Sequence, residues 1–364
     1  MTDGLDIAFF GSSLVSAWWN GACTYYRGII RNLHSLGHRV TFYEPDAFDR
    51  QAHRDIGDPD WATVVVYRAE TEAQVRATVA TAAGADVVVK ASGVGAFDEV
   101  LEAAVLERAD GALTVFWDVD APASLTRMEG NSADPFRSLV PCYDLIFTYG
   151  GGEPVVRRYR MLGARQCIVV GNALDPWTHF PVNPDDRFRA DLGLLANRLP
   201  DREDRVDEFF FRPASTLRDH TFLLAGNGWA TKKMPANVRS IGHLGTGDHN
   251  SFNSTPTAVL NVTRSSMVAN GYSPATRVFE AAGAAACLIT DEWDGIAEFL
   301  EPDAEVLVAR DGAEVAERLS ALDETRAQAI GDAARTRVLA QHTYAHRARQ
   351  VDRILRAHAR STSR

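Results

Sequence analysis

The sequence has 364 residues, of which 46% are apolar and 24% charged, and this length and composition leave room for two soluble α/β domains. A formal net charge of −10 argues against a general nucleic-acid-binding protein, which would carry an excess of positive charge. Four scattered cysteines, an acidic start without a signal-peptide pattern and no apolar run of ~18 residues predict a cytoplasmic protein without a membrane span.

Apolar strand-like runs alternate with helical patterns in the first half of the chain. Runs such as Thr63-Val-Val-Val are typical of parallel strands buried on both faces. The predicted strands are Asp6–Phe10, Arg39–Tyr43, Thr63–Tyr67, Asp86–Val89, Leu113–Trp117, Leu145–Thr148 and Cys167–Val170. The predicted helices are Thr24–Leu36, Glu72–Ala83, Phe97–Arg108 and Pro154–Leu162. This alternation predicts a doubly wound α/β domain.

The pattern breaks at Asn172–Asp186, which holds three prolines, and then resumes. The later predicted strands are Leu192–Leu195, Thr221–Ala225, Val238–Ile241, Ala258–Val262, Ala286–Thr290 and Glu305–Val308. Helices are predicted at Ala313–Ser320, Glu324–His342 and Ala345–Ala359. We therefore predict two Rossmann-like, doubly wound domains facing across a cleft. Their bounds are 1–175 and 190–342, with a linker at 176–189 and a C-terminal helix and tail at 343–364.

The most informative loop precedes a predicted helix in the second domain. Ser273 is expected to cap this helix, with Pro274 at its first position. The free backbone N–H groups at its start, and Arg277 one turn in, favour an anion. Glu280 adds a carboxylate on the same face, suited to ribose hydroxyls. A nucleoside diphosphate requires this combination, although a capped helix with a surface Arg–Glu pair has the same pattern.

This segment and the Asp291-Glu-Trp-Asp-Gly-Ile-Ala-Glu-Phe-Leu-Glu-Pro run after it resemble the donor-binding half of GT-B glycosyltransferases, with a group 1 or family 4-like donor domain, and specifically the CgeB-like group. Gly171-Asn-Ala-Leu-Asp-Pro-Trp-Thr-His-Phe-Pro resembles the N-G-V-D-x-x-x-F-x-P motif that joins the domains of retaining GT-B enzymes. The resemblance covers nearly the whole chain. It implies a metal-independent enzyme that uses a nucleotide-diphosphate sugar, expected to be a UDP-sugar, and needs no cofactor.

The resemblance also implies roles for individual residues. Glu280 matches the glutamate that holds the ribose, and Arg198 and Arg202 match a basic pair that meets the diphosphate. Tyr272 stands where the retaining family has a second glutamate, which is a departure from the pattern. The predicted donor-binding residues are Arg198, Arg202, Arg264, Ser273, Ala275, Thr276, Arg277 and Glu280, with no metal.

Two carboxylates end a predicted strand of the first domain in Phe116-Trp-Asp-Val-Asp. We predict that both belong to the catalytic site. Asp118 would act as the general base if the enzyme inverts, and Asp120 is the better candidate for capping the following helix. A metal-binding D-x-D motif is the alternative. The predicted acceptor-side residues follow other strands and could equally be ordinary turn residues; they are Gly11, Trp19, Asn20, Gly21, Lys90, Gly150 and Gly151.

The leading hypothesis is a glycosyltransferase whose partners are a nucleotide sugar and an acceptor that the sequence does not identify. One alternative is a nucleotide-sugar epimerase of the same fold. The other is a non-catalytic protein that binds sugar nucleotides.

Overall fold

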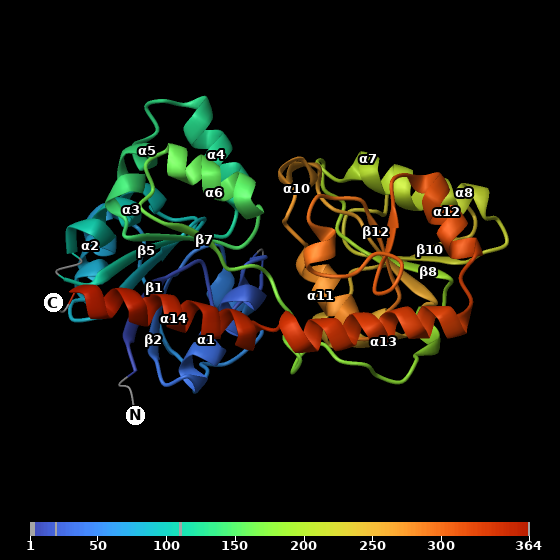
Figure 1. The fold of residues 1–364 in the computed structure, drawn as a ribbon, viewed down its shortest axis with the longest axis horizontal. Coiled ribbons are helices and arrows are strands. Elements are labelled where there is room, and N and C mark those ends of the chain that lie inside the picture. Colours follow the sequence, from blue (N-terminus) through green and yellow to red (C-terminus); the bar gives the residue numbers. More distant parts are fainter. Residues whose placement is uncertain (1–3, 19, 109–110, 363–364) are drawn as a thin grey trace. The chain divides into compact units, whose positions relative to one another are not determined.

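A computed structural model describes residues 4–18, 20–108 and 111–362. The chain divides into two units (Figure 1). The first consists of Met1–Gly171 together with Tyr344–Arg364, and the second of Asn172–Thr343. The predicted linker, residues 176–189, therefore lies within the second unit. None of the described helices is both long and apolar enough to cross a membrane.

The first unit is built on a seven-stranded sheet of order β3-β2-β1-β4-β5-β6-β7, in which every pairing is parallel. Its strands are β1 (Asp6–Phe10), β2 (Arg39–Pro45), β3 (Thr63–Tyr67), β4 (Val87–Ala91), β5 (Leu113–Asp118), β6 (Leu145–Thr148) and β7 (Cys167–Val169). All of these were predicted to within two residues at each end. The valines of β4 are buried on both faces, as their β-branched run predicts.

Helices cover both faces of this sheet (Figure 1). They are α1 (Cys23–Ser35), α2 (Glu72–Ala80), α3 (Asp98–Arg108), α4 (Ala121–Gly130), α5 (Pro135–Leu139), α6 (Gly152–Met161) and α14 (Tyr344–Thr362). Helix α1 packs with α14, while α2 and α3 pack together. The four helices whose ranges were predicted in this half, α1, α2, α3 and α6, are confirmed, and α4 and α5 are additional to them.

The second unit has a six-stranded parallel sheet of order β10-β9-β8-β11-β12-β13. Its strands are β8 (Leu192–Leu195), β9 (Phe222–Ala225), β10 (Val238–Gly242), β11 (Ala258–Asn261), β12 (Leu288–Asp291) and β13 (Leu307–Ala309). Its helices are α7 (Glu203–Val206), α8 (Arg212–Thr216), α9 (His249–Ser254), α10 (Ser265–Asn270), α11 (Thr276–Gly283), α12 (Gly312–Ser320) and α13 (Glu324–Gln341). Short turns of 3-10 helix occur in both units. They lie at Arg50–His53 and Val140–Cys142 in the first unit and at Asp186–Phe188, Thr246–Asp248 and Ile296–Glu298 in the second, which also has a π-helical turn at Asp207–Phe211.

Alternating side chains of the second sheet enter two different cores. Leu260 shares one core with Val315 of α12, whereas its neighbour Val259 shares the other with Phe279 of α11. Successive strand residues point to opposite faces, so a sheet covered on both sides needs apolar residues at both. Both units therefore have the doubly wound architecture that the sequence predicts.

The last helix of the chain, α14, packs on α1 of the first unit. At Gly28 of α1 the approach is so close that an added Cβ would lie 2.2 Å from Tyr344 Cδ2. Farther along, Asp352 Oδ1 lies 2.8 Å from Nε2 of buried His38. Because Gly28 has no side chain, α14 can pack closely against α1.

Replacement of this glycine tests the packing. We expect Gly28→Ala to lower the free energy of unfolding by about 1–3 kcal/mol, because the new methyl group overlaps the Tyr344 ring. Gly130→Ala is the matched control, since Gly130 is also helical but has no atom near its added Cβ. Chemical denaturation measures both. Equal stability of the two variants would contradict the close packing.

Candidate nucleotide-binding site in the second unit

The candidate site lies at the carboxyl ends of strands β8, β11 and β12. In the sheet order, β8 and β11 are the neighbours at which the direction of winding reverses. Open α/β sheets bind ligands at such a switch point, outside the carboxyl ends of the strands. Arg198 and Arg202 follow β8, and Arg264 follows β11. The predicted donor-binding residues therefore come from the loops where this fold places a ligand.

Arg202, Arg264 and Arg277 form a cluster of positive charge. Burial lowers the pKa of Arg202, and the charges of Arg264 and Arg277 lower it further, which reflects their mutual proximity. Nε of Arg202 is buried and has no hydrogen-bond partner among the described residues. Arg264 is partly neutralised by Asp201, whose Oδ2 lies 2.6 Å from Arg264 Nε. Neighbouring positive charges and an unsatisfied buried donor are unfavourable by themselves, so such a cluster suits the binding of an anion.

Arg198 has a different environment from Arg202. Its guanidinium forms two hydrogen bonds with the Glu203 carboxylate, at 2.6 and 2.8 Å, and Lys232 Nζ lies 3.0 Å from the same carboxylate. Hydrogen bonds from Arg198 and Lys232 lower the pKa of Glu203 to about 2. Arg198 would have to leave Glu203 to meet a phosphate, whereas the buried Nε of Arg202 has no hydrogen bond to give up within the described part of the chain.

Helix α11 begins later than the sequence predicts. The expected cap was Ser273 with Pro274 at the first helical position, but the helix starts at Thr276 and Ala275 is the extended residue before it. Ser273 is instead buried, and the Pro274 carbonyl accepts a hydrogen bond from Asn172 Nδ2 at 3.2 Å. The backbone of Tyr272 is left-handed, with a φ of 50°, which delays the helix. The free N–H groups at the helix start are consequently those of Thr276 and Arg277.

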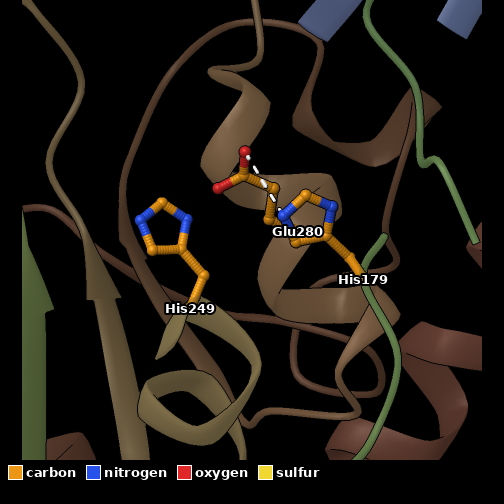
Figure 2. A group of neighbouring side chains, drawn as sticks. All are labelled: His179, His249 and Glu280. Carbon is orange, nitrogen blue, oxygen red and sulfur yellow. Dashed lines mark ion pairs between the residues drawn. The ribbon is translucent and has the colours of Figure 1, made fainter. Parts of the chain in front are cut away.

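Glu280 lies one turn into α11, with the imidazoles of His179 and His249 near its carboxylate (Figure 2). Arg277 Nη1 is 3.1 Å from Glu280 Oε2 as an ion pair, without hydrogen-bond alignment. The other oxygen, Oε1, lies 3.8 Å from His179 Nε2. Burial raises the pKa of Glu280, but Arg277, His179 and His249 together outweigh burial and hold it below its ordinary value. The carboxylate is therefore ionised at neutral pH.

His179 and His249 are site residues that the sequence analysis missed. His249 is the first residue of α9, and burial, aided by Arg277, lowers its pKa to about 4, so its imidazole is neutral. His179 lies in the irregular segment after Asn172, where its backbone N donates to the Asp175 carbonyl at 3.0 Å. The two histidines and Glu280 come from distant parts of the sequence. Their spacing gives no signal, and only the fold brings them together.

Asp291 is a further residue that was not predicted to act. Its buried carboxylate accepts hydrogen bonds from Thr263 N at 3.0 Å and from Thr263 Oγ1 at 2.9 Å. Arg205 Nη2 donates to its other oxygen at 2.5 Å. Asp291 thus fixes the loop that carries Arg264, and we consider it a positioning residue.

The structure gives Asp118 and Asp120 roles other than those predicted. Asp118 is completely buried at the end of β5. Its Oδ1 accepts from Asp120 N at 3.0 Å and Ser124 Oγ at 3.1 Å, and its Oδ2 from the Tyr159 hydroxyl. Burial raises the pKa of Asp118 despite these bonds. A carboxylate with both oxygens engaged inside the core does not support the role of general base.

Asp120 occupies the residue before α4, but its side chain makes no capping hydrogen bond. The expectation that it caps the helix is therefore wrong. Asp118 instead tethers the start of α4, because its carboxylate accepts from the backbone N of Asp120 and from the Ser124 hydroxyl. The sequence locates the end of the strand correctly but does not show which of the two side chains points inward.

Most of the predicted acceptor-side residues are buried in the first unit. Asn20 donates from Nδ2 to the carbonyls of Ser13 and Ser16, at 2.9 and 3.1 Å. Lys90 is completely buried and pairs with Asp98 and, at 3.6 Å, with Glu102. The four glycines differ: Gly11 packs against Phe42, Gly151 against Val155, Gly150 is buried, and Gly21 is exposed with no neighbour for an added Cβ. Trp19 lies outside the described residues.

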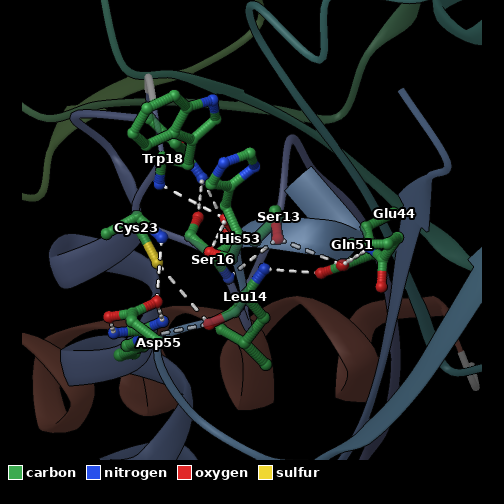
Figure 3. A network of polar contacts seen from close by, with 12 residues as sticks. Ser13, Leu14, Ser16, Trp18, Cys23, Glu44, Gln51, His53 and Asp55 are labelled. Carbon is green, nitrogen blue, oxygen red and sulfur yellow. Dashed lines mark hydrogen bonds and ion pairs between the residues drawn. The ribbon is translucent and has the colours of Figure 1, made fainter. Parts of the chain in front are cut away.

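Hydrogen bonds hold the loop after β1 in place (Figure 3). The Glu44 carboxylate accepts from Ser13 Oγ at 3.0 Å and Leu14 N at 2.6 Å, and Ser16 Oγ donates to the His53 carbonyl at 2.8 Å. Trp18 stacks on the His53 ring with 4.1 Å between centroids, yet 44% of its surface is exposed. Trp18 is thus a partly exposed aromatic side chain of this loop.

Comparison with known proteins finds a sequence similarity in part of the chain. Residues 202–353 match the family model described as Glycosyl transferase-like. This stretch includes most of the second unit and the start of α14. No curated protein matches the sequence.

The whole chain is similar in fold to solved glycosyltransferases. HepE from Anabaena, solved with UDP and glucose, superposes with a TM-score of 0.67 and 13% identity over 97% of this chain and 100% of that chain. Sucrose-phosphate synthase from Thermosynechococcus elongatus has a TM-score of 0.68 and 14% identity over 97% and 98%. BGT of T4 phage, solved with UDP-glucose, has a TM-score of 0.60 and 12% identity over 97% and 99%. The shared fold is GT-B, as predicted.

The buried hydrogen bond between Tyr159 and Asp118 leads to a prediction. Tyr159→Phe should lower the free energy of unfolding by about 1–3 kcal/mol, because it leaves a buried carboxylate oxygen without its donor. Tyr67→Phe is the control, since the Tyr67 hydroxyl is buried without a hydrogen-bond partner among the described residues. Urea denaturation compares the two. Similar losses in both variants would remove Asp118 from its structural role.

Proposed function

We propose that this protein is a glycosyltransferase that moves a sugar from a nucleotide-diphosphate sugar to an acceptor. The second unit would bind the donor and the first unit the acceptor. The family match over residues 202–353 and the GT-B fold support this reaction class. The sequence resemblance supports the CgeB-like group as the subfamily. The four cysteines of the chain are free, which agrees with a reducing, cytoplasmic location.

One observation carries the proposal: in the described structure, two buried guanidinium N–H groups lack a hydrogen bond, and one of them lies beside an ionised carboxylate. Arg202 Nε and Arg277 Nη1 are buried N–H groups without a hydrogen bond among the described residues. Glu280 keeps its charge beside Arg277. A nucleoside diphosphate satisfies both needs, because its phosphate oxygens accept from guanidinium groups and its ribose hydroxyls donate to a carboxylate. A ligand with only one of these features would satisfy only one side of the site.

UDP is the nucleotide that we expect, by analogy with the complexes of HepE and of T4 phage BGT. During transfer, the leaving diphosphate gains negative charge. Arg202, Arg264 and Arg277, with the N–H groups of Thr276 and Arg277, would stabilise this charge. Arginines would thus stabilise the leaving diphosphate as a divalent ion does in other transferases, and no cofactor would be required.

Affinity measurements can separate phosphate from ribose recognition. Arg202→Gln should weaken UDP binding by about 1.5–3 kcal/mol, the usual contribution of a charged hydrogen bond, but leave uridine binding unchanged. Glu280→Ala should weaken both ligands by a similar amount, because it removes the ribose contact. Calorimetric titration of the full chain measures all four combinations.

Arg189→Gln is the matched control, since Arg189 is a surface arginine of the same unit paired with Asp186. The control should bind UDP as the wild type does. If Arg202→Gln and Glu280→Ala also retain wild-type affinity while folding normally, the assignment of this site is wrong. A panel of UDP-sugars, assayed for UDP release with and without acceptors, then tests the reaction itself.

Chelation tests the role of the arginines in the reaction. We expect transfer activity to persist in EDTA, because three guanidinium groups already supply positive charge for the leaving diphosphate. The rate is measured before and after dialysis against the chelator. A complete loss of activity that Mg²⁺ or Mn²⁺ restores would mean that a metal ion, and not the arginine cluster, stabilises the leaving group.

A further inference from the structure

Two imidazoles and one carboxylate converge in the second unit in a way that nucleotide binding alone does not explain. The potential ligand atoms of His179, His249 and Glu280 all lie within 4.8 Å of one another. Figure 2 shows the two imidazoles on either side of the carboxylate. The three residues come from an irregular segment, the start of α9 and the second turn of α11. Different supporting elements thus bring these donors to one point.

This set of donors is chemically that of a zinc site. Two histidines and one glutamate, with a fourth position open, form one of the three-ligand sets that bind Zn²⁺ in proteins. Bonds of about 2.0–2.1 Å in a tetrahedron place ligand atoms about 3.4 Å apart. His179 Nε2 and Glu280 Oε1 are already 3.8 Å apart. Small side-chain rotations, without movement of the backbone, would close the group around an ion.

The neighbouring cation, Arg277, does not occupy the carboxylate oxygen of Glu280 that faces His179. Its Nη1 contacts Oε2 of Glu280, at 3.1 Å, whereas Oε1 is the oxygen closest to His179. One oxygen therefore remains for a metal ion while the other keeps its ion pair. The positive charge of Arg277 still repels a divalent ion, so the affinity should be below that of a structural zinc site. Imidazole donors favour Zn²⁺ over Mg²⁺, which prefers oxygen ligands.

We propose that His179, His249 and Glu280 bind Zn²⁺, and that the bound ion competes with the nucleotide for Glu280. The competition, but not the binding of Zn²⁺, rests on the proposed function. Coordination uses the same carboxylate that would accept hydrogen bonds from the ribose, so each ligand lowers the affinity of the other. Zn²⁺ is thus an inhibitor at the donor site and not a cofactor of the reaction.

Calorimetric titration of Zn²⁺ into the full chain tests the binding. Every variant is made in a Cys142→Ser background, because Cys142 is an exposed free cysteine and thiolates are themselves zinc ligands. His179→Ala and His249→Ala should each weaken Zn²⁺ binding at least about tenfold, since loss of even an outer partner of a metal ligand has such an effect. His243→Ala is the control, an exposed histidine on the same unit that lies outside the cluster.

The control should bind Zn²⁺ like its parent, and Mg²⁺ should give no comparable signal. Equal Zn²⁺ affinity in the parent and in both test variants, with unchanged melting temperatures, would overturn the site. A second titration with UDP present tests the competition. An apparent Zn²⁺ dissociation constant that rises with UDP supports a shared Glu280, and an unchanged one overturns the sharing. Failure of UDP to bind any variant, with Zn²⁺ binding intact, would contradict the proposed function and leave the zinc site supported.

Discussion

All strands in both sheets run parallel, and this constraint determines where in each unit a functional site can lie. Parallel strands bury both faces, so neither face of the sheet can carry a polar site. Their carboxyl ends lie along one edge, and the loops there are the positions free to bear charge. In the second unit this edge collects Arg202 after β8, Arg264 after β11 and Asp291 at the end of β12. The site is thus a consequence of strand direction.

Buried charges at this edge lower the stability of the fold unless an opposite charge compensates them. Arg264 is balanced by Asp201, and Arg205 by buried Asp291. Arg202 is the member whose buried Nε stays without a hydrogen bond among the described residues. Unsatisfied buried donors are few in natural proteins, and those that persist are often sites of function. Arg198, in contrast, is engaged with Glu203, and this contrast is the reason why we propose Arg202 as the main phosphate-binding arginine.

The sequence predicted the architecture much better than the site. Apolar, β-branched runs such as that of β4 have a period that local sequence reveals, and every predicted strand is present. The start of α11 was missed because Tyr272 adopts a left-handed backbone that its side chain does not favour. The wrong expectations for Asp118 and Asp120 have another cause, because the buried carboxylate of Asp118 is engaged by Tyr159, which is far away in sequence. His179 and His249 are likewise joined only by tertiary structure.

Arg277 gives Glu280 its chemical character. Burial alone would favour the protonated carboxyl, which could neither hold a metal ion nor accept two hydrogen bonds from a ribose. Arg277 is the nearest charge that opposes burial, and it acts through Oε2. Because the guanidinium occupies only that oxygen, the second oxygen stays directed toward His179 and available to a ligand. The ion pair therefore both keeps the carboxylate charged and decides which of its oxygens is offered. Binding of either proposed ligand, a sugar nucleotide or a zinc ion, depends on this difference between the two oxygens of the carboxylate.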